Sequence, residues 1–227
     1  MIDLEHNDIN DIPLEDKWNF GDKAELLMHK IHAYPAKFPA FIATKAFDYA
    51  EQEGVDVHSV ADVFCGCGTV ALEAKLHSKV FWGVDINPVA TLIAKTKSAS
   101  YDVAVLADYY EKISAAYENV KNSHTDYMDA NKRLKYWFTE RNYIDLLRLR
   151  SSIENIVTEE GYKEAFLCLF SAILKTSSRW LIKSIKPQVD PSKVDVVVWE
   201  VFKQYVDKFS KAIIQIDSCI FNPVKIN

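Results

Sequence analysis

The strongest constraint on the fold comes from two glycines separated by one residue, Gly66 and Gly68. Before them, residues 59–64 form a short, mostly apolar run typical of a buried strand, and after them residues 70–76 are suited to a helix. A glycine turn between strand and helix lets a ligand approach the backbone. The free amides at the start of the helix favour electron-rich groups there. The segment therefore predicts a ligand-binding turn.

A second strand and helix follow at once. Residues 79–84 form another apolar run that ends at Asp85, and Asn87 and Pro88 suit the cap and first turn of a helix that continues to Lys97. The order strand, helix, strand, helix predicts the opening of a parallel sheet with right-handed crossovers.

The segment before the turn carries two prolines that hold the preceding residues extended. Pro39 suits the first position of a helix, and Gly54 is well placed to end it. The sequence therefore predicts a shaped loop over residues 29–39 that leads into a helix.

From Asp102 onward, apolar residues recur at helical spacing. We expect a helix capped by Thr139, a helical run over residues 165–185, and a last helix that begins at Asp190 and Pro191. The triplet of valines at residues 196–198 also suits a strand.

These patterns divide the chain into a loosely ordered arm (1–28), an α/β part (29–100) and a helical region (101–227). The predicted fold class is α/β, a partial Rossmann-like fold followed by mostly helical structure. Two strands do not make a stable doubly wound sheet, because parallel sheets need several strands and cover on both faces. We therefore expect part of the sheet to be missing from this chain.

Composition excludes several classes of protein. With 49% hydrophobic and 26% charged residues, the 227-residue chain is globular rather than disordered. Four cysteines at these spacings form no disulfide framework, and no secretory or membrane-spanning run is present, so we expect a cytoplasmic protein without membrane contact. Cys65 and Cys67 lack a second pair of ligands for zinc, so we expect no metal site.

Charge is divided unevenly along the chain. Residues 1–130 hold 11 Lys and Arg against 21 Asp and Glu, whereas residues 131–227 hold 16 against 11 and include every arginine. The second part is therefore basic, and its helices are candidates for contact with a phosphate backbone. The alternative is an ordinary solvated helix face. The residues concerned are Arg133, Lys135, Tyr136, Trp137, Arg141, Arg148 and Arg150.

The glycine turn alone leaves the cofactor open. Residues 66–71 fit G-x-G-x-x-A, and the later Asp85 suits a ribose, so a dinucleotide is one candidate. Asp62 argues against it, because a carboxylate at the end of the strand repels a pyrophosphate but accepts from an ammonium. A ligand with an ammonium, a ribose and no phosphate is S-adenosylmethionine.

Three segments then resemble one family in the order of that family. Residues 62–69 are similar to the D-x-F-x-G-x-G-T signature of DNA methyltransferases that modify exocyclic amino groups, the adenine-N6 and cytosine-N4 enzymes. Residues 32–39 resemble their H-x-Y-P-A-K-F-P segment, and residues 83–88 resemble a third element. The long helical stretch behind them is similar to cytosine-N4 relatives, so we expect cytosine N4 rather than adenine N6 as the target.

The resemblance implies S-adenosylmethionine as cofactor and DNA as partner, in a restriction-modification setting. It implies that residues 32–39 help to hold the methionine part, that Asp85 binds the ribose and that Asn87 lies beside the adenine. The candidate cofactor-binding residues are Lys37, Phe38, Pro39, Asp62, Phe64, Cys65, Gly66, Gly68, Thr69, Asp85, Ile86 and Asn87.

The catalytic tetrapeptide of that family is absent from the chain. It consists of Asp, Asn or Ser, two prolines and an aromatic residue, and the nearest fragments, at Asn87 and Asn222, have one proline each. We therefore name no catalytic residue and expect a second polypeptide, or a downstream segment, to supply the motif. The alternatives are an RNA or small-molecule methyltransferase, and a non-catalytic subunit that binds a partner.

Overall fold

The computed structural model describes residues 25–35, 37–119, 124–184 and 186–217. Most of the predicted arm, residues 1–24, lies outside this part of the chain. Residues 25–28 are within it, and Met28 is buried in the core. The short 3-10 helix η3 (Leu27–Lys30) packs against the last helix of the chain.

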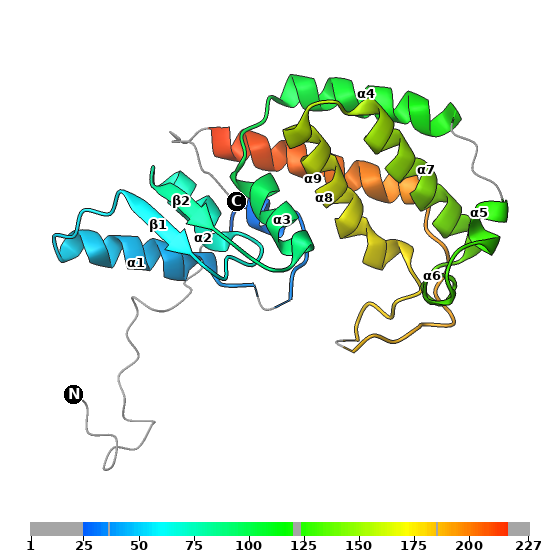
Figure 1. Ribbon diagram of the computed structural model, residues 1–227, viewed down its shortest axis with the longest axis horizontal. Helices are drawn as coiled ribbons and strands as arrows, with labels where there is room; N and C mark the ends of the chain where they lie inside the picture. Colours follow the sequence, from blue (N-terminus) through cyan, green and yellow to red (C-terminus); the bar gives the residue numbers. More distant parts are fainter. Residues whose placement is uncertain (1–24, 36, 120–123, 185, 218–227) are drawn as a thin grey trace, which may run out of the picture.

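The described strands are β1 (Ser59–Asp62) and β2 (Val80–Gly83), which pair in parallel with Ser59 opposite Val80 and Asp62 opposite Gly83. Three helices accompany them in Figure 1: α1 (Ala40–Gln52), α2 (Thr69–Leu76) and α3 (Pro88–Ser98). The expected strand–helix–strand–helix order is therefore present.

Within the described part of the chain, one face of this sheet is covered and the other is exposed. Phe81 is fully buried against alanines of α2 and α3. The side chains that alternate with it, Val80, Trp82 and Val84, are exposed, as is Val63 after β1. Parallel sheets in folded proteins are normally covered on both faces. The described part of the chain leaves one apolar face and both edges of the sheet without a partner.

Most of the rest of the described chain is helical and lies to one side of the sheet (Figure 1). The longer helices α4, α7, α8 and α9 pack on one another, and α3 packs on α8, so one hydrophobic core runs from the α/β part into the helical region. The helices are α4 (Val103–Asn119), α5 (His124–Met128), α6 (Lys132–Trp137), α7 (Glu140–Ile156), α8 (Glu160–Ser177) and α9 (Val198–Asp217). The result is a mixed α/β protein that is mostly helical, with a two-stranded parallel sheet.

Two helix boundaries differ from the expectation. The predicted run over residues 165–185 ends at Ser177, because the chain then turns and Trp180 forms an antiparallel bridge with Val189. The last helix begins at Val198 rather than at Asp190, whose carboxylate instead accepts hydrogen bonds from the backbone N–H and the hydroxyl of Ser192. No helix follows this turn directly, so Asp190 closes a turn and does not cap α9.

Two smaller differences concern local chemistry. Pro39 is the N-cap of α1 rather than its first residue, and α1 ends near Gly54 as expected. The valines at residues 196–198 form no strand.

In the described residues, no helix is long and apolar enough to cross a bilayer.

Candidate functional site

The glycine turn adopts a conformation that only glycine takes easily. Both Gly66 and Gly68 have positive φ, at 50° and 71°. A Cβ on Gly68 would lie 2.6 Å from the Cα of Ala94, because α3 approaches the start of α2 closely there. The two glycines therefore shape the turn and bring α3 beneath it.

Asp85 fixes this turn from the neighbouring strand. Its carboxylate accepts a hydrogen bond from the backbone N–H of Gly66 (2.9 Å) and another from that of Asn87 (2.8 Å). Asn87 in turn caps α3 by accepting from the N–H of Val89 (3.0 Å). One side chain thus ties the ends of β1 and β2 together. Each carboxylate oxygen keeps a free lone pair for a ligand hydroxyl.

A cavity of about 300 Å³ opens beside the turn, at the carboxyl ends of the strands. This is the edge at which open α/β sheets bind ligands. Seven of the predicted site residues line it, and five do not. Those in the lining are Lys37, Phe38, Asp62, Phe64, Cys65, Gly66 and Thr69. Those outside it are Pro39, Gly68, Asp85, Ile86 and Asn87.

Three further residues line the cavity that the sequence reasoning did not single out: Tyr34, Cys67 and Val70. The sequence contains a feature that could have identified each of these residues. Tyr34 lies in the proline-bearing loop, Cys67 lies between the two glycines, and Val70 lies in the first turn of α2. Tyr34 also receives a hydrogen bond from the Asn87 side chain on its hydroxyl oxygen (3.4 Å), which links the loop to α3.

Two large apolar side chains stand free at the same edge of the sheet. Phe64 is 87% exposed and Ile86 is 100% exposed, each at the end of a neighbouring strand. Exposed apolar groups beside a cavity are a common feature of ligand sites, because a bound ring covers them. The pair therefore suits a flat, apolar ligand surface.

The charges around the cavity are of both signs. One oxygen of Asp62 accepts from the backbone N–H of Phe64 (3.0 Å), and its other oxygen has no hydrogen bond within the described chain. Lys37 donates to the carboxylate of Glu25 (2.5 Å). Burial raises the pKa of Glu25, but the hydrogen bond and charge of Lys37 outweigh it and lower the pKa overall. The cavity thus offers one carboxylate oxygen to a cationic group.

The histidines of the loop have structural partners. His32 donates from Nδ1 to the carbonyl of Ala33 (2.8 Å), and its Nε2 meets the Ser171 hydroxyl of α8 (3.1 Å). Burial lowers the pKa of His32, so the neutral ring is favoured. His29 is buried and pairs with Glu73 of α2 (2.7 Å). These contacts anchor the loop to the helices on both sides.

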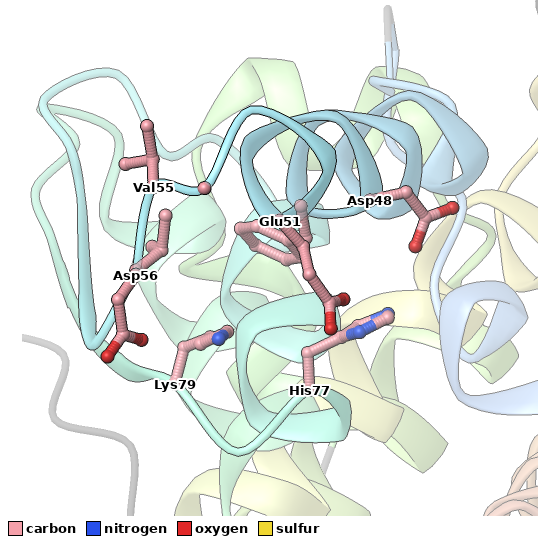
Figure 2. A pocket seen from close by; sticks show the side chains of 9 residues that line it. Asp48, Glu51, Val55, Asp56, His77 and Lys79 are labelled. Atoms are coloured by element: carbon pink, nitrogen blue, oxygen red, sulfur yellow. The ribbon is translucent and has the colours of Figure 1, made fainter.

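A second hollow, of about 360 Å³, lies at the opposite end of the sheet (Figure 2). There Glu51 extends from α1 toward the end of α2, where His77 packs on the ring of Phe47. The hollow lies near the amino ends of the strands, away from the glycine turn. Among the described residues no group of three or more side chains is arranged to hold a metal ion.

The sequence model of the D12 class N6 adenine-specific DNA methyltransferases matches residues 46–191, well over half of the chain. The chain belongs to this family of DNA methyltransferases. The matched range includes the glycine turn and Asp85, and the family implies S-adenosylmethionine as methyl donor. The earlier expectation of cytosine N4 as the target finds no support in the family, which is defined by adenine N6.

One curated relative is the Type II methyltransferase M.MvaI of Kocuria varians, which is 24% identical over 180 residues. The similarity covers 75% of this chain but 39% of the relative, so the chain matches well under half the length of that protein. No solved structure matches the chain.

Proposed function

We propose that this chain forms the S-adenosylmethionine-binding part of a DNA amino-methyltransferase. The observation that carries the proposal is the convergence, at one edge of the sheet, of a glycine turn, two carboxylates and two exposed apolar side chains. A cofactor with an ammonium, a ribose and a flat base matches each of these groups. A dinucleotide would place a pyrophosphate against Asp62, where like charges repel.

Each part of the cofactor then has a partner. The free oxygen of Asp62 accepts from the ammonium, and the lone pairs of Asp85 accept from the ribose hydroxyls. Phe64 and Ile86 flank the adenine, with Asn87 beside it. The backbone at Cys65, Gly66, Gly68 and Thr69 lies along the methionine part. The loop residues Lys37 and Phe38 close the cavity from the other side, and Pro39 follows them as the N-cap of α1.

The proposed target is an exocyclic amino group of a DNA base, and the family indicates the N6 amine of adenine. A base in a duplex must leave the stack before its amine can reach the sulfonium methyl. Transfer then depends on holding the amine in line with that methyl.

We further propose that the residues that hold the target amine lie outside these 227 residues, in a second polypeptide or in a downstream segment. Two observations support this. The tetrapeptide typical of amino-methyltransferases occurs nowhere in the 227 residues. In addition, a parallel strand added beside β1 would end next to Asp62 and the cavity, and a helix above it would cover Trp82 and its apolar neighbours.

The DNA-facing surface is proposed at the far end of the helical region. There α6 is joined to the segment after α8 by Arg179. Its guanidinium donates to the carbonyl of Lys135 (2.9 Å), and its backbone N–H donates to the carbonyl of Trp137 (2.7 Å). Figure 1 shows this corner away from the sheet. Its exposed cationic side chains are Lys132, Arg133, Arg141, Lys183 and Lys186.

Arg148, another candidate for DNA contact, does not belong to this surface. Its guanidinium donates to the backbone carbonyl of Tyr117 (2.7 Å) and lies over the Tyr117 ring at 4.6 Å. The residue therefore joins α7 to α4. Arg150 is exposed but pairs with Glu154 one turn later (2.9 Å).

A methyl-transfer assay tests the proposal. Labelled S-adenosylmethionine is incubated with the chain and with mixed-sequence duplex DNA, single-stranded RNA, or no nucleic acid. The chain alone is expected to bind the cofactor without turnover on any substrate. DNA methylation is expected once the polypeptide or downstream segment that carries the tetrapeptide is supplied. Turnover by the chain alone would contradict the proposal that the catalytic residues lie outside it. Methylation of RNA instead of DNA would contradict the proposed substrate class.

A further inference from the structure

A fully buried lysine lies under the floor of the cofactor cavity. The side chain of Lys97, on α3, is 0% exposed, and its Nζ donates to the Sγ of Cys67 at 3.4 Å. This is its one hydrogen bond among the described residues. Burying an amine against a single weak acceptor is costly, so the pair calls for an explanation beyond packing.

The two cysteines of the glycine turn have opposite surroundings. Cys65 faces the carboxylates of Asp62 and Asp85, and burial together with these charges raises the pKa of its thiol to about 11. Cys67, two residues later, faces the Lys97 amine instead. The thiolate is the form that reacts with oxidants, so a raised thiol pKa disfavours oxidation. The surroundings of Cys65 therefore disfavour its oxidation, whereas Cys67 lies beside the Lys97 amine.

We propose that Cys67 and Lys97 form an oxidant-sensitive modification site in which a peroxide links the Sγ and Nζ atoms covalently. The geometry carries the proposal, because the two atoms already lie within hydrogen-bond distance. Cys67 also lines the cavity, which gives a molecule as small as hydrogen peroxide a path to its sulfur.

The chemistry takes two steps. In the first, the Cys67 thiolate attacks one oxygen of hydrogen peroxide and the O–O bond breaks. A sulfenic acid forms, and the departing hydroxide takes a proton from solvent to become water, so sulfur is oxidised and peroxide is reduced. In the second, the Lys97 nitrogen attacks Sγ, the S–N bond forms, and the S–O bond breaks to release water with an amine proton. This step needs a neutral amine, and burial lowers the pKa of Lys97.

The link would tie α3 to the glycine turn. Because Cys67 lies between Gly66 and Gly68, any change in its position alters the backbone that the cofactor is proposed to contact. We therefore expect the linked protein to bind S-adenosylmethionine more weakly, and bound cofactor to shield Cys67. These two consequences rest on the proposed function, whereas formation of the link does not.

The test treats the full chain with hydrogen peroxide, blocks remaining thiols with iodoacetamide, and maps peptides by mass spectrometry without reductant. The expected product joins the peptides of Cys67 and Lys97, is lighter than the reduced pair by two hydrogen atoms, and reverts with dithiothreitol. Cys65 is expected to remain alkylated. Oxidation of Cys65 as fast as Cys67, or no S–N product, would overturn the proposal.

Two variants identify the partner of the sulfur. Lys97→Met removes the amine and keeps the volume, so Cys67 is expected to stop at the sulfenic acid, which dimedone traps. Cys168→Ser removes the other buried thiol near Lys97 and is expected to leave the link intact. A product that survives Lys97→Met and disappears in Cys168→Ser is a disulfide and contradicts the proposal.

A last comparison separates this inference from the proposed function. The oxidation is repeated with saturating S-adenosylmethionine, and calorimetry measures cofactor binding before and after oxidation. If the link forms but the cofactor neither binds nor protects, the proposed function fails and the modification site stands. If the cofactor binds but no link forms, the reverse holds.

Discussion

At the scale of single residues, both the backbone conformation and the close approach of α3 require a glycine at position 68. Its φ of 71° is one that side chains disfavour, and α3 leaves no room for a Cβ. Gly54 has the same φ of 71° but no atom within 4 Å of its virtual Cβ. The two glycines therefore separate the cost of backbone strain from the cost of a steric clash.

Gly68→Ala is expected to destabilise the protein by roughly 3 kcal/mol, about 1 from the left-handed backbone and about 2 from overpacking against Ala94. Gly54→Ala should cost about 1 kcal/mol, from strain alone. Urea unfolding of both variants, followed by circular dichroism, measures the difference. Equal losses of stability would show that α3 does not press on the turn.

Lys75 gives a pH-dependent prediction. It donates to the carbonyl of Ala99 (2.7 Å) at the end of α3, and burial lowers its pKa from 10.5 to about 8. Between these values the unfolded chain holds a proton that the folded chain has released, so this residue makes stability rise with pH. Below about pH 8 both states are protonated and the full cost of burial applies.

The measurement compares the wild-type chain with Lys75→Met by urea unfolding from pH 7 to pH 11. The stability of the wild type relative to the variant should rise between about pH 8 and 10.5 and then level off. Buried Cys65 and Cys168, whose pKa values are raised, destabilise both proteins as pH increases, so their effect cancels in the difference. A flat difference would contradict the burial of a charged Lys75.

At the scale of elements, two of the helix caps and the glycine turn were predicted well from the sequence, whereas the cap expected at Asp190 was not. Asn87 and Thr139 cap α3 and α7 as expected, since a short polar side chain before an amphipathic run has few other structural uses. The end of α8 could not be predicted, because the chain leaves the helix to pair Trp180 with Val189. That pairing depends on contacts distant in sequence.

Thr139 also has a second role. Its hydroxyl oxygen accepts from the N–H of Asn142 (3.3 Å), and the hydroxyl donates to the carboxylate of Asp195 (2.8 Å). Thr139→Ala should therefore cost about 1–2 kcal/mol, from the lost cap and the unpaired carboxylate. Thr139→Ser keeps both bonds and should cost much less. Thermal unfolding of the two variants distinguishes them, and equal melting temperatures would contradict the double role.

At the scale of the whole molecule, the described residues form a two-stranded sheet, and seven of the twelve site residues predicted from the sequence line one cavity at its edge. Asp62, the glycine turn and Asp85 come together because parallel strands end at one edge. The sequence did not reveal that Asp85 holds the backbone of Gly66, nor that Lys97 lies beneath Cys67, since both contacts depend on how α3 packs. The spacing of residue types along the chain does not predict how helices pack on one another.

The basic corner of the molecule gives a prediction about salt. Replacing Lys183 and Lys186 together by Gln is expected to weaken nonspecific binding of duplex DNA and to reduce the slope of log K against log salt by about 1–2. Arg150→Gln, at an exposed but paired arginine, serves as the matched control and should leave the slope nearly unchanged. Fluorescence anisotropy over a salt series measures both. An unchanged slope in the double variant would place the DNA elsewhere.

The most direct test of the central claim is calorimetric titration of the chain with S-adenosylmethionine and, separately, with NAD. One S-adenosylmethionine is expected to bind per chain, with affinity lowered about tenfold or more in Asp62→Asn, which keeps the shape of the side chain but removes the charge that the ammonium needs. NAD should bind far more weakly. Preferential binding of NAD, or S-adenosylmethionine affinity indifferent to Asp62→Asn, would contradict the account.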